Sequence, residues 1–385
     1  MTAGLKTHWK TIIIGGGQAG LVTGYHLQQL GEDFLILEAA ASVGASWRNR
    51  WDSLRLFTPA WANRLDGYKF PGDQESFAGK DTMATYLHDY AKFHRLPVRT
   101  GAKVTALRKS GYGYTLAIEE EVLTCNNVVI ANGNFAKPKL PSFARQIKPS
   151  IKQLHSSAYR RPSDLPGGNI LVVGAGTSGL QIAIDLAGSG RKVYVSGTPP
   201  PKIPSFILKY FGKQFVWFAG NILTVKTPIG KKLARKFKSG HAASPLINVS
   251  LQDAIDAGVE QVPRVKEVIQ GFPALQDYRK MEVDAIVWCT GFTTDFSWVR
   301  LEGIQDANGF PLARRGFSEN HPNLYFMGML FQYSLSSATI NGMSRDAEYI
   351  AKQIQKTNQA TPPSQQNKIS ENSPHTALNT GLTVE

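Results

Sequence analysis

Two glycine-rich turns carry the strongest chemical signal in this sequence of 385 residues. The first, Gly15-x-Gly17-x-x-Gly20, follows a β-branched run and precedes an apolar stretch with helical spacing. In such a turn the glycines permit a tight bend, close approach of a pyrophosphate and packing of helix on strand, while helix N-terminal amides face the phosphates. Glu38 ends the next apolar run, where a carboxylate accepts hydrogen bonds from ribose hydroxyls. The pattern predicts a dinucleotide site formed by Gly15, Gly17, Gln18, Ala19, Gly20 and Glu38.

The second turn, Gly174-x-Gly176-x-x-Gly179, repeats this unit about 160 positions later. The strand that follows its helix ends at Ser196 with no acidic residue; a carboxylate would repel a 2′-phosphate, whereas a serine can donate a hydrogen bond to it. NADP is therefore favoured over NAD. Two dinucleotide sites in one chain indicate a tightly held FAD and a dissociable NADPH that reduces it. The second site is assigned to Gly174, Gly176, Thr177, Ser178, Gly179 and Ser196, with charge offered by Arg191, Lys192 and Lys202.

Composition narrows the choice of electron acceptor. The two cysteines lie 164 positions apart (289 − 125), which excludes a disulfide framework, a Cys-x-x-Cys redox pair and a cysteine-based zinc site. The sequence shows no cluster of metal ligands, so we predict no metal and take dioxygen as the simplest acceptor. The net charge of +14 fits an enzyme that binds anionic cofactors, and no zinc finger or RNA-recognition signature supports a nucleic-acid partner.

Both turns must be positioned by parallel strands. Residues 10–14, 21–30 and 34–38 form one β-α-β unit, and the same order recurs around the second turn. We predict an α/β fold with two Rossmann-like dinucleotide-binding domains, the second inserted in the first. Residues 160–168 are rich in turn formers and are interpreted as the crossing linker. The expected parts are 1–160 (FAD domain, first part), 161–288 (NADP domain), 289–356 (FAD domain, returning part) and 357–385 (disordered tail).

Four motifs occur in a fixed order along the chain. They are Gly15-Gly-Gly-Gln-Ala-Gly-Leu21, Val43-Gly-Ala-Ser-Trp-Arg48, His155-Ser-Ser-Ala-Tyr159-Arg160 and Cys289-Thr-Gly-Phe292. Together they resemble the flavin-containing monooxygenases (class B flavoprotein monooxygenases), especially the bacterial CzcO-like branch and the plant auxin-forming enzymes. The resemblance implies that NADPH and dioxygen form a C4a-(hydro)peroxyflavin, which inserts one oxygen atom into a small organic substrate. The flavin carries this chemistry, and no catalytic side chain is assigned. It places further cofactor contacts at Ser46, Trp47, Arg48, Val104, Thr290, Gly291 and Gln332.

Two departures from that family bear on the chemistry. Many members place an Asn beside the flavin, where this loop offers Thr58-Pro59, so the peroxyflavin would lack that contact. Tyr159 stands where Baeyer–Villiger enzymes carry Trp, which argues against ketone oxygenation. Two alternatives therefore stay open: an NADPH-dependent flavin reductase or oxidase that oxygenates nothing, and a flavoprotein partner of a membrane transporter.

Residues 206–238 have an unusual composition, because an aromatic run is followed by six basic residues within 226–238. One interpretation is a helical pair that lines the substrate entrance or forms the face of a homodimer. The other is a peripheral membrane contact, in which aromatic side chains enter the bilayer and basic ones meet anionic lipid. The N-terminus lacks the apolar core of a signal peptide, which predicts a cytoplasmic protein.

Overall fold

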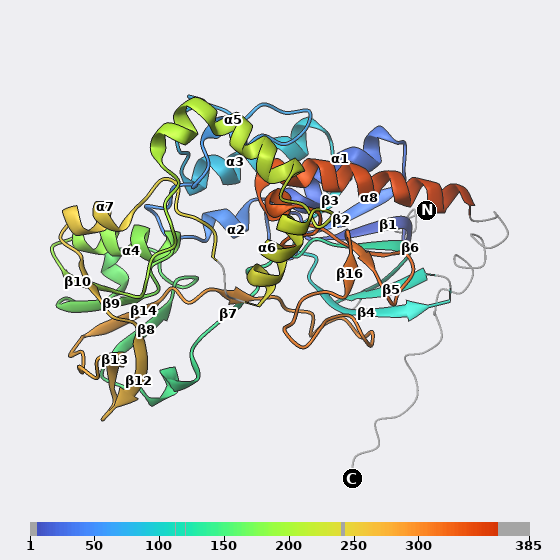
Figure 1. Cartoon of the computed structure of the whole chain (residues 1–385). Coiled ribbons are helices and arrows are strands. Elements are labelled where there is room, and N and C mark those ends of the chain that lie inside the picture. Colours follow the sequence, from blue (N-terminus) through green and yellow to red (C-terminus); the bar gives the residue numbers. More distant parts are fainter. Residues whose placement is uncertain (1–5, 112, 120, 240–242, 361–385) are drawn as a thin grey trace, which may run out of the picture.

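The first unit of the fold is a large mixed sheet covered by helices (Figure 1). The computed structural model describes residues 6–111, 113–119, 121–239 and 243–360. Within them this sheet contains β1 (His8–Ile14), β2 (Phe34–Leu37), β3 (Val98–Arg99), β4 (Val104–Ser110), β5 (Gly113–Ile118), β6 (Glu121–Ile130), β16 (Ala313–Arg314), β17 (Phe317–Ser318) and β18 (Leu324–Phe326). Strands β18-β6-β1-β2-β3 run parallel, while β16 and β17 extend one edge in antiparallel fashion.

Most buried residues of the central strands are apolar because both faces of the sheet are covered. On one face Ile13 and Ile36 pack beneath the helices. On the other, Ile12 and Leu35 pack against the antiparallel strands β4 and β5. The helical elements of this unit are α1 (Gln18–Gln29), α2 (Ala45–Arg48), η1 (Ala60–Ala62), α3 (Lys80–Phe93), η4 (Leu335–Ala338) and α8 (Ile340–Ala360).

The second unit is a smaller sheet in which every pairing is parallel, in the order β11-β10-β9-β14-β8. Its strands are β8 (Lys152–His155), β9 (Asn169–Val173), β10 (Lys192–Ser196), β11 (Glu260–Val262) and β14 (Ala285–Trp288). Its other elements are η2 (Ser142–Gln146), η3 (Pro162–Asp164), α4 (Thr177–Ala187), α7 (Leu251–Asp256) and the ribbon of β12 (Val265–Ile269) and β13 (Phe272–Leu275). The predicted α/β fold with an inserted second unit is confirmed.

The chain crosses between the units twice, and the two crossings pair with each other. Strand β7 (Lys137–Pro138) lies antiparallel to β15 (Phe292–Thr293). The outward crossing therefore precedes β8, and the predicted boundary at residue 160 is too late. Strand β8 was missed because it is an edge strand in which only Leu154 is strongly apolar, so its sequence shows no buried run.

The predicted start of the disordered tail is also wrong. Helix α8 continues to Ala360, so residues 357–360 are helical. The Asn358 side chain accepts a hydrogen bond from Asn127 (2.8 Å) and donates one to Glu32 (2.6 Å), which ties the polar helix end to the first sheet. Composition does not reveal such tertiary bonds. Residues 361–385 lie outside the described residues.

Helices α5 (Ser205–Asn221) and α6 (Pro228–Lys238) follow β10 but pack on the first unit. Val225 donates its amide to the Tyr333 carbonyl (2.8 Å), and Leu335 donates its amide to the Leu223 carbonyl (3.0 Å). The predicted helical pair is thus present, and it bridges the two units. No helix of the described residues is long and apolar enough to cross a membrane.

Candidate cofactor sites

The first glycine-rich turn connects β1 to α1 and has the geometry that its sequence predicts. Gly15 has a φ of +111°, and a Cβ there would collide with the Ala131 carbonyl. A Cβ on Gly20 would collide with the Gly15 carbonyl, so the helix can pack here only with glycine. A Cβ on Gly17, in contrast, would meet no atom within 4 Å. Gly17 therefore faces open space, which fits the pyrophosphate of a dinucleotide.

Glu38 closes the edge of this turn. Its carboxylate accepts hydrogen bonds from the amides of Gly16 and Ala40, each at 2.8 Å. The Glu38 carbonyl accepts the Ala102 amide (2.9 Å), two residues before Val104, which is buried with Ile12 and Leu35 on the sheet face that β4 and β5 cover. The carboxylate is half-buried and held beside the turn, where it can accept bonds from a ribose.

Helix α2 brings Trp47 to the turn. The Trp47 indole donates to the Gln18 side chain at 3.3 Å, although the two residues lie 29 positions apart. Arg48 instead holds its own loop, with its guanidinium on the Val43 carbonyl (2.9 Å), and Ser46 is exposed. Ala19 is buried among the core residues of the first unit.

Three other predicted contacts lie elsewhere. The Thr290 hydroxyl donates to the Lys139 carbonyl, and the Gly291 carbonyl accepts the Lys139 amide (3.0 Å), so both residues belong to the crossing. Gln332 is buried and its amide is used within its own turn, where its carbonyl accepts the Met329 amide (3.3 Å).

His155 is the other polar residue at the crossing. Its Nε2 donates to the Gly291 carbonyl (2.9 Å), and its Nδ1 accepts the Ser157 amide (3.1 Å). Burial lowers the pKa of the imidazole, and the neighbouring Arg50 acts in the same direction. His155 is therefore a neutral residue that holds β15 to the second unit.

The second glycine-rich turn, between β9 and α4, repeats the geometry of the first. Gly174 has a φ of +113°, and a Cβ there would collide with the Cys289 carbonyl; a Cβ on Gly179 would collide with the Gly174 carbonyl. A Cβ on Gly176 would again meet no atom within 4 Å. Thr177 and Ser178 form the first turn of α4, where free amides can face a phosphate.

Ser196 does not have the role predicted from the sequence. It is only 1% exposed, and its hydroxyl donates to the Pro263 carbonyl (3.0 Å) while accepting the Val265 amide (2.9 Å). The residue between these two partners is Arg264, which is exposed and makes no hydrogen bond or ion pair through its guanidinium within the described residues. Ser196 therefore positions the turn that presents Arg264.

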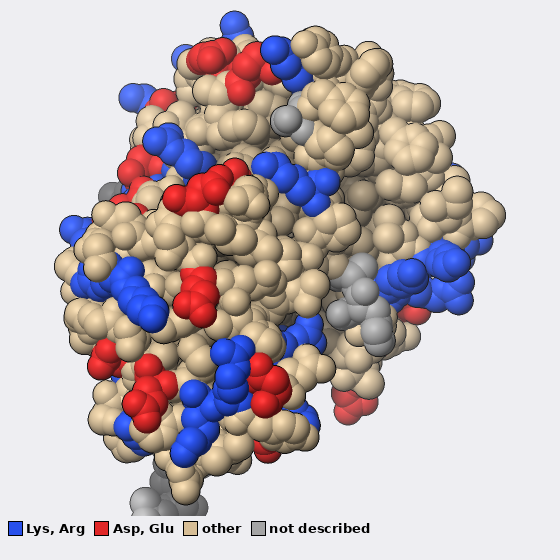
Figure 2. Space-filling view, turned by 60° about the vertical axis from the view of Figure 1, so that its left-hand side comes forward, with Lys and Arg blue, Asp and Glu red and all other residues tan. Residues whose placement is uncertain are grey.

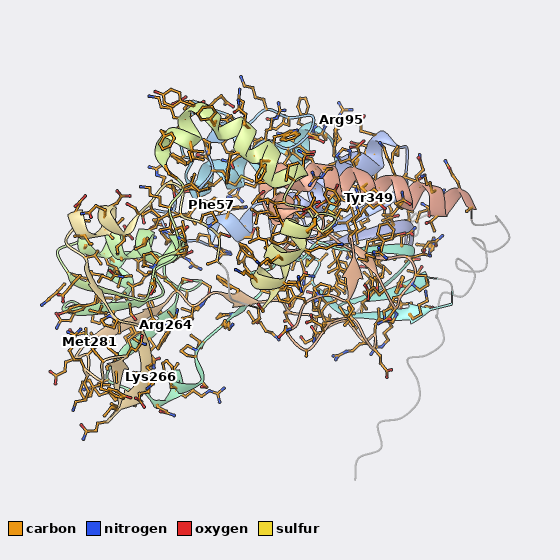
Figure 3. All side chains as sticks on the ribbon, in the orientation of Figure 1. Phe57, Arg95, Arg264, Lys266, Met281 and Tyr349 are labelled. Atoms are coloured by element: carbon orange, nitrogen blue, oxygen red, sulfur yellow. The ribbon has the colours of Figure 1, made fainter. Side chains whose placement is uncertain are left out.

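Sequence reasoning missed Arg264 because it lies 68 positions (264 − 196) from the end of β10. The parallel pairing of β10 with β11 brings the two strand ends together. Arg264 is labelled on the second unit in Figure 3. Of the predicted basic residues, Arg191 binds the Leu165 carbonyl (3.2 Å), and Lys202 faces Asp253 at 3.6 Å.

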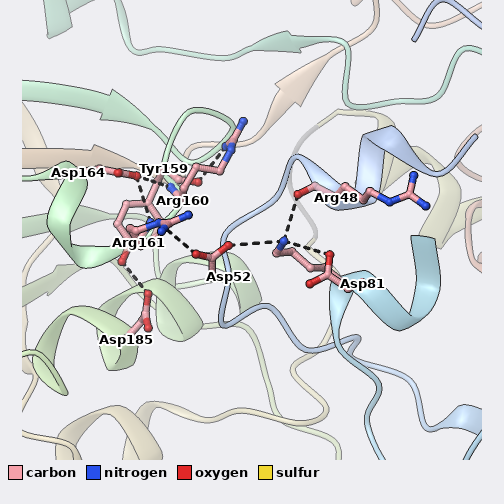
Figure 4. Close-up of polar contacts among 9 residues, drawn as sticks. Arg48, Asp52, Asp81, Tyr159, Arg160, Arg161, Asp164 and Asp185 are labelled. Atoms are coloured by element: carbon pink, nitrogen blue, oxygen red, sulfur yellow. Dashed lines mark hydrogen bonds and ion pairs between the residues drawn. The ribbon is translucent and has the colours of Figure 1, made fainter. Parts of the chain in front are cut away.

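A polar network joins the two units beside the first turn (Figure 4). Asp52 faces Lys80 at 3.5 Å and Arg161 at 3.2 Å, and its amide donates to the Arg160 carbonyl (2.8 Å). Tyr159, from the predicted fingerprint, is fully buried and donates to Asp185 of α4 (2.7 Å).

Two cations at the crossing have no such carboxylate partner. The Arg50 guanidinium lies over the ring of Phe292 (5.3 Å to the ring centre), and burial together with the charge of Arg160 lowers its pKa. Arg160 donates to the carbonyls of Ser157 (2.7 Å) and Tyr159 (3.0 Å). Within the described residues neither side chain forms an ion pair, so the crossing carries uncompensated positive charge.

Comparison with known proteins identifies the class of molecule. The family described as pyridine nucleotide-disulphide oxidoreductase matches residues 12–202. A CzcO-like oxidoreductase of Geobacillus kaustophilus is 35% identical over 344 residues, covering 89% of this chain and 97% of that protein. An indole-3-pyruvate monooxygenase of Oryza sativa subsp. japonica is 27% identical, covering 89% and 90%. A flavin-containing monooxygenase from Stenotrophomonas maltophilia shares the fold with a TM-score of 0.74 at 23% identity, covering 91% and 99%.

The structure has one mixed sheet and one parallel sheet, each with an open glycine-rich turn, and a paired crossing joins the two units. Together with these similarities, this arrangement defines a two-domain flavoprotein oxidoreductase. The chain belongs to the CzcO-like oxidoreductases of bacteria, and it is similar in sequence to an indole-3-pyruvate monooxygenase and in fold to a flavin-containing monooxygenase. The family predicted from the four motifs is confirmed.

Proposed function

We propose that this protein is an FAD-dependent, NADPH-reduced monooxygenase that inserts one oxygen atom into a small organic substrate. The observation that carries the proposal is the pair of open turns. At Gly17 and at Gly176 an added Cβ would meet no atom within 4 Å, so each turn leaves room for a pyrophosphate. Each turn also packs on a residue where the chain begins to cross between the units. This residue is Ala131 for the first turn and Cys289 for the second.

The residues of the chain bind and orient the cofactors, and FAD when bound supplies the redox and oxygen-transfer chemistry. The turn that contains Gly17 and the amides of α1 hold its pyrophosphate, and Glu38 accepts bonds from its ribose. Trp47, fixed by Gln18, lies beside the first turn, where a flat indole can pack against a flavin ring. No side chain is proposed as a nucleophile.

The choice of NADPH rests on Arg264 and on the crossing. The exposed guanidinium of Arg264 follows β11 next to the end of β10, the place where a Rossmann fold holds the adenosine ribose. A bidentate guanidinium suits a 2′-phosphate. Arg50 and Arg160 add positive charge between the units, which favours an anionic dinucleotide there.

Dioxygen is the proposed acceptor because the cysteines cannot act as a redox pair. Cys125 lies in β6 of the first unit and Cys289 follows β14 of the second. Burial raises the pKa of Cys125 and raises that of Cys289 to about 12, so both thiols stay protonated. The disulphide chemistry in the name of the matched family is therefore not proposed here.

An oxidase or reductase that oxygenates nothing is the second candidate. Asn63, in the loop near Thr58, is fully buried and bonded to Thr58 through both its carbonyl oxygen (2.5 Å) and its amide nitrogen (3.0 Å). The Asn63 side chain is thus used within its own loop. We infer that it does not contact the flavin, and the lack of this contact favours an oxidase or reductase.

Oxygen mixing separates the two candidates. The FAD-loaded protein is reduced with NADPH without oxygen and then mixed with aerated buffer. A monooxygenase shows a delayed return of the oxidised spectrum while NADP stays bound. Because no substrate is present to take an oxygen atom, its peroxide appears only at this slow rate. Immediate reoxidation with one peroxide per NADPH contradicts the proposal and supports an oxidase.

A further inference from the structure

Helix α5 carries its aromatic residues on the outside. Phe206, Tyr210 and Trp217 are 58%, 65% and 61% exposed, and their spacing, together with that of Lys213, places them along one face. Phe211 and Phe218 are exposed beside this stripe, while Gly212 and Ala219 are buried toward the protein. A surface helix normally shows its polar face to water, so α5 is inverted. Exposed aromatic clusters of this kind mark an interaction surface.

Helix α6 continues this surface with positive charge. Its exposed side chains include Lys231, Lys232, Arg235, Lys236 and Lys238, and Ile229 at its start is 64% exposed. Residues 205–238 contain eight Lys and Arg but no Asp or Glu. An open hollow of about 720 Å³ at the end of α6 is lined by Lys232, Arg235, Lys236 and Lys238 together with Ser239 and Asn308. It would suit a phosphate-bearing headgroup in size and charge.

The two helices are held in this orientation by the first unit. Arg345 donates to the Gly220 carbonyl at the end of α5 (2.6 Å), and Thr227 caps α6 by accepting the Gly230 amide (3.1 Å). Phe237 on the inner side of α6 packs against Phe331, with ring centres 5.4 Å apart. In Figure 2 a cluster of blue lies on the right beneath a broad tan area, over these helices.

We propose that α5 and α6 form a docking surface for an anionic phospholipid bilayer. The aromatic stripe of α5 enters the interface between headgroups and acyl chains, and the basic side chains of α6 contact lipid phosphates. Trp and Tyr suit this boundary because their rings are apolar and their N–H and O–H groups are polar. An apolar face flanked by lysines and arginines is the pattern of helices that lie in a membrane surface.

Charge distinguishes the bilayer from a second copy of this chain. A two-fold contact through this surface would bring sixteen cations (8 + 8) together with no carboxylate from residues 205–238 of either copy. An anionic bilayer instead attracts each basic residue near its surface. Nucleic acid would also attract the lysines, but it would leave the aromatic stripe of α5 without an apolar partner.

Vesicle flotation tests the proposal with the FAD-loaded full chain. We expect binding to mixed phosphatidylcholine–phosphatidylglycerol vesicles at low salt and little binding to phosphatidylcholine alone. The double variant Lys232→Glu/Lys236→Glu should bind roughly tenfold or more weakly. The matched control, Lys103→Glu/Arg108→Glu, changes the charge equally on exposed positions of the first unit and should bind like the wild type.

Fluorescence tests whether the aromatic stripe enters the lipid. Brominated acyl chains should quench part of the tryptophan emission of the bound protein, and this quenching should disappear in Trp217→Phe, which still floats. Equal loss of binding in both charge variants contradicts the proposal, because net charge would then suffice. A lipid-free dimer that buries Trp217, tighter binding to single-stranded DNA than to vesicles, or no flotation at low salt also overturns it.

Discussion

In each of the two turns, one glycine is required by the packing of the protein and another leaves space for a ligand. A Cβ at Gly20 or Gly179 would collide with a carbonyl of its own turn, so these residues serve the packing of helix on strand. Gly17 and Gly176 have ordinary negative φ values and open space around them, so a larger residue there is excluded only by a ligand.

We therefore expect Gly17→Ala to fold normally and to lose FAD. The added methyl group contacts nothing in the protein but enters the space of the pyrophosphate. The absorbance of the purified protein measures the flavin, and the melting temperature of the flavin-free protein should stay within about 2 °C of wild type. Gly20→Ala is the contrasting variant and should melt lower because its methyl collides with Gly15. Full flavin in Gly17→Ala would contradict the assignment.

Arg264 yields the second prediction at this scale. Arg264→Leu should raise KM for NADPH by roughly 10- to 100-fold and leave KM for NADH unchanged, because a charged hydrogen bond is worth about 1.5–3 kcal/mol. Ser196→Ala should give a smaller rise of the same kind. Lys266→Leu is the control, since Lys266 faces Tyr278 at 3.2 Å. Equal rises for both nucleotides would show that the 2′-phosphate is not bound at Arg264.

Residue types alone could not assign these roles. The sequence predicts cofactor contacts at the glycines, Glu38 and Trp47 because these predictions need only neighbours along the chain or a motif. The contacts of Ser196 and the position of Arg264 could not be predicted in this way, because the pairing of β10 with β11 decides what lies near each side chain.

At the scale of elements, the sequence predicts the strands that are continuous runs of apolar residues. Strands β1, β2, β9 and β10 were recognised because buried parallel strands are runs of apolar residues. The short strand β8 and the crossing pair β7 and β15 were not, because their polar or brief sequences acquire a conformation only from partners more than a hundred positions away.

The crossing should depend on pH through His155. Its folded pKa is lowered, so the unfolded chain takes up a proton below about pH 6.5 that the folded protein resists. Stability is therefore lost as pH falls through that value. His155→Gln keeps a donor for the Gly291 carbonyl but cannot titrate. Between pH 7.5 and pH 5.5 the melting temperature of the variant should therefore fall less than that of the wild type. Parallel curves would contradict this role.

The end of α8 should contribute to stability despite its polar sequence. Asn358→Ala removes bonds to Asn127 and Glu32 and should cost about 1 kcal/mol of unfolding free energy, or roughly 2–4 °C in melting temperature. Gln359→Ala, at an exposed neighbour on the same helix, should change little. Equal melting temperatures for the two variants would show that the bonds at Asn358 add nothing.

At the scale of the whole molecule, two cofactor sites on two sheets must respond separately. NADP should raise the melting temperature of the FAD-loaded protein, since a ligand at 100 times its Kd adds about 2.7 kcal/mol to the folded state. Gly176→Ala should abolish this shift while the yellow colour is kept. Gly17→Ala should lose the yellow colour but keep a melting shift with NADP. A shift that survives Gly176→Ala would place the nicotinamide dinucleotide elsewhere.

The pairing of β7 with β15 has a consequence for how such a molecule can change over generations. The chain enters and leaves the inserted unit at the same place, because Lys137 and Thr293 are partners in the strand pairing. A stretch whose ends are neighbours can be exchanged as a cassette without cutting the sheet that hosts it. A lineage could thus exchange the inserted unit, where we propose that NADPH binds, and with it the reductant, while the first unit is inherited unchanged.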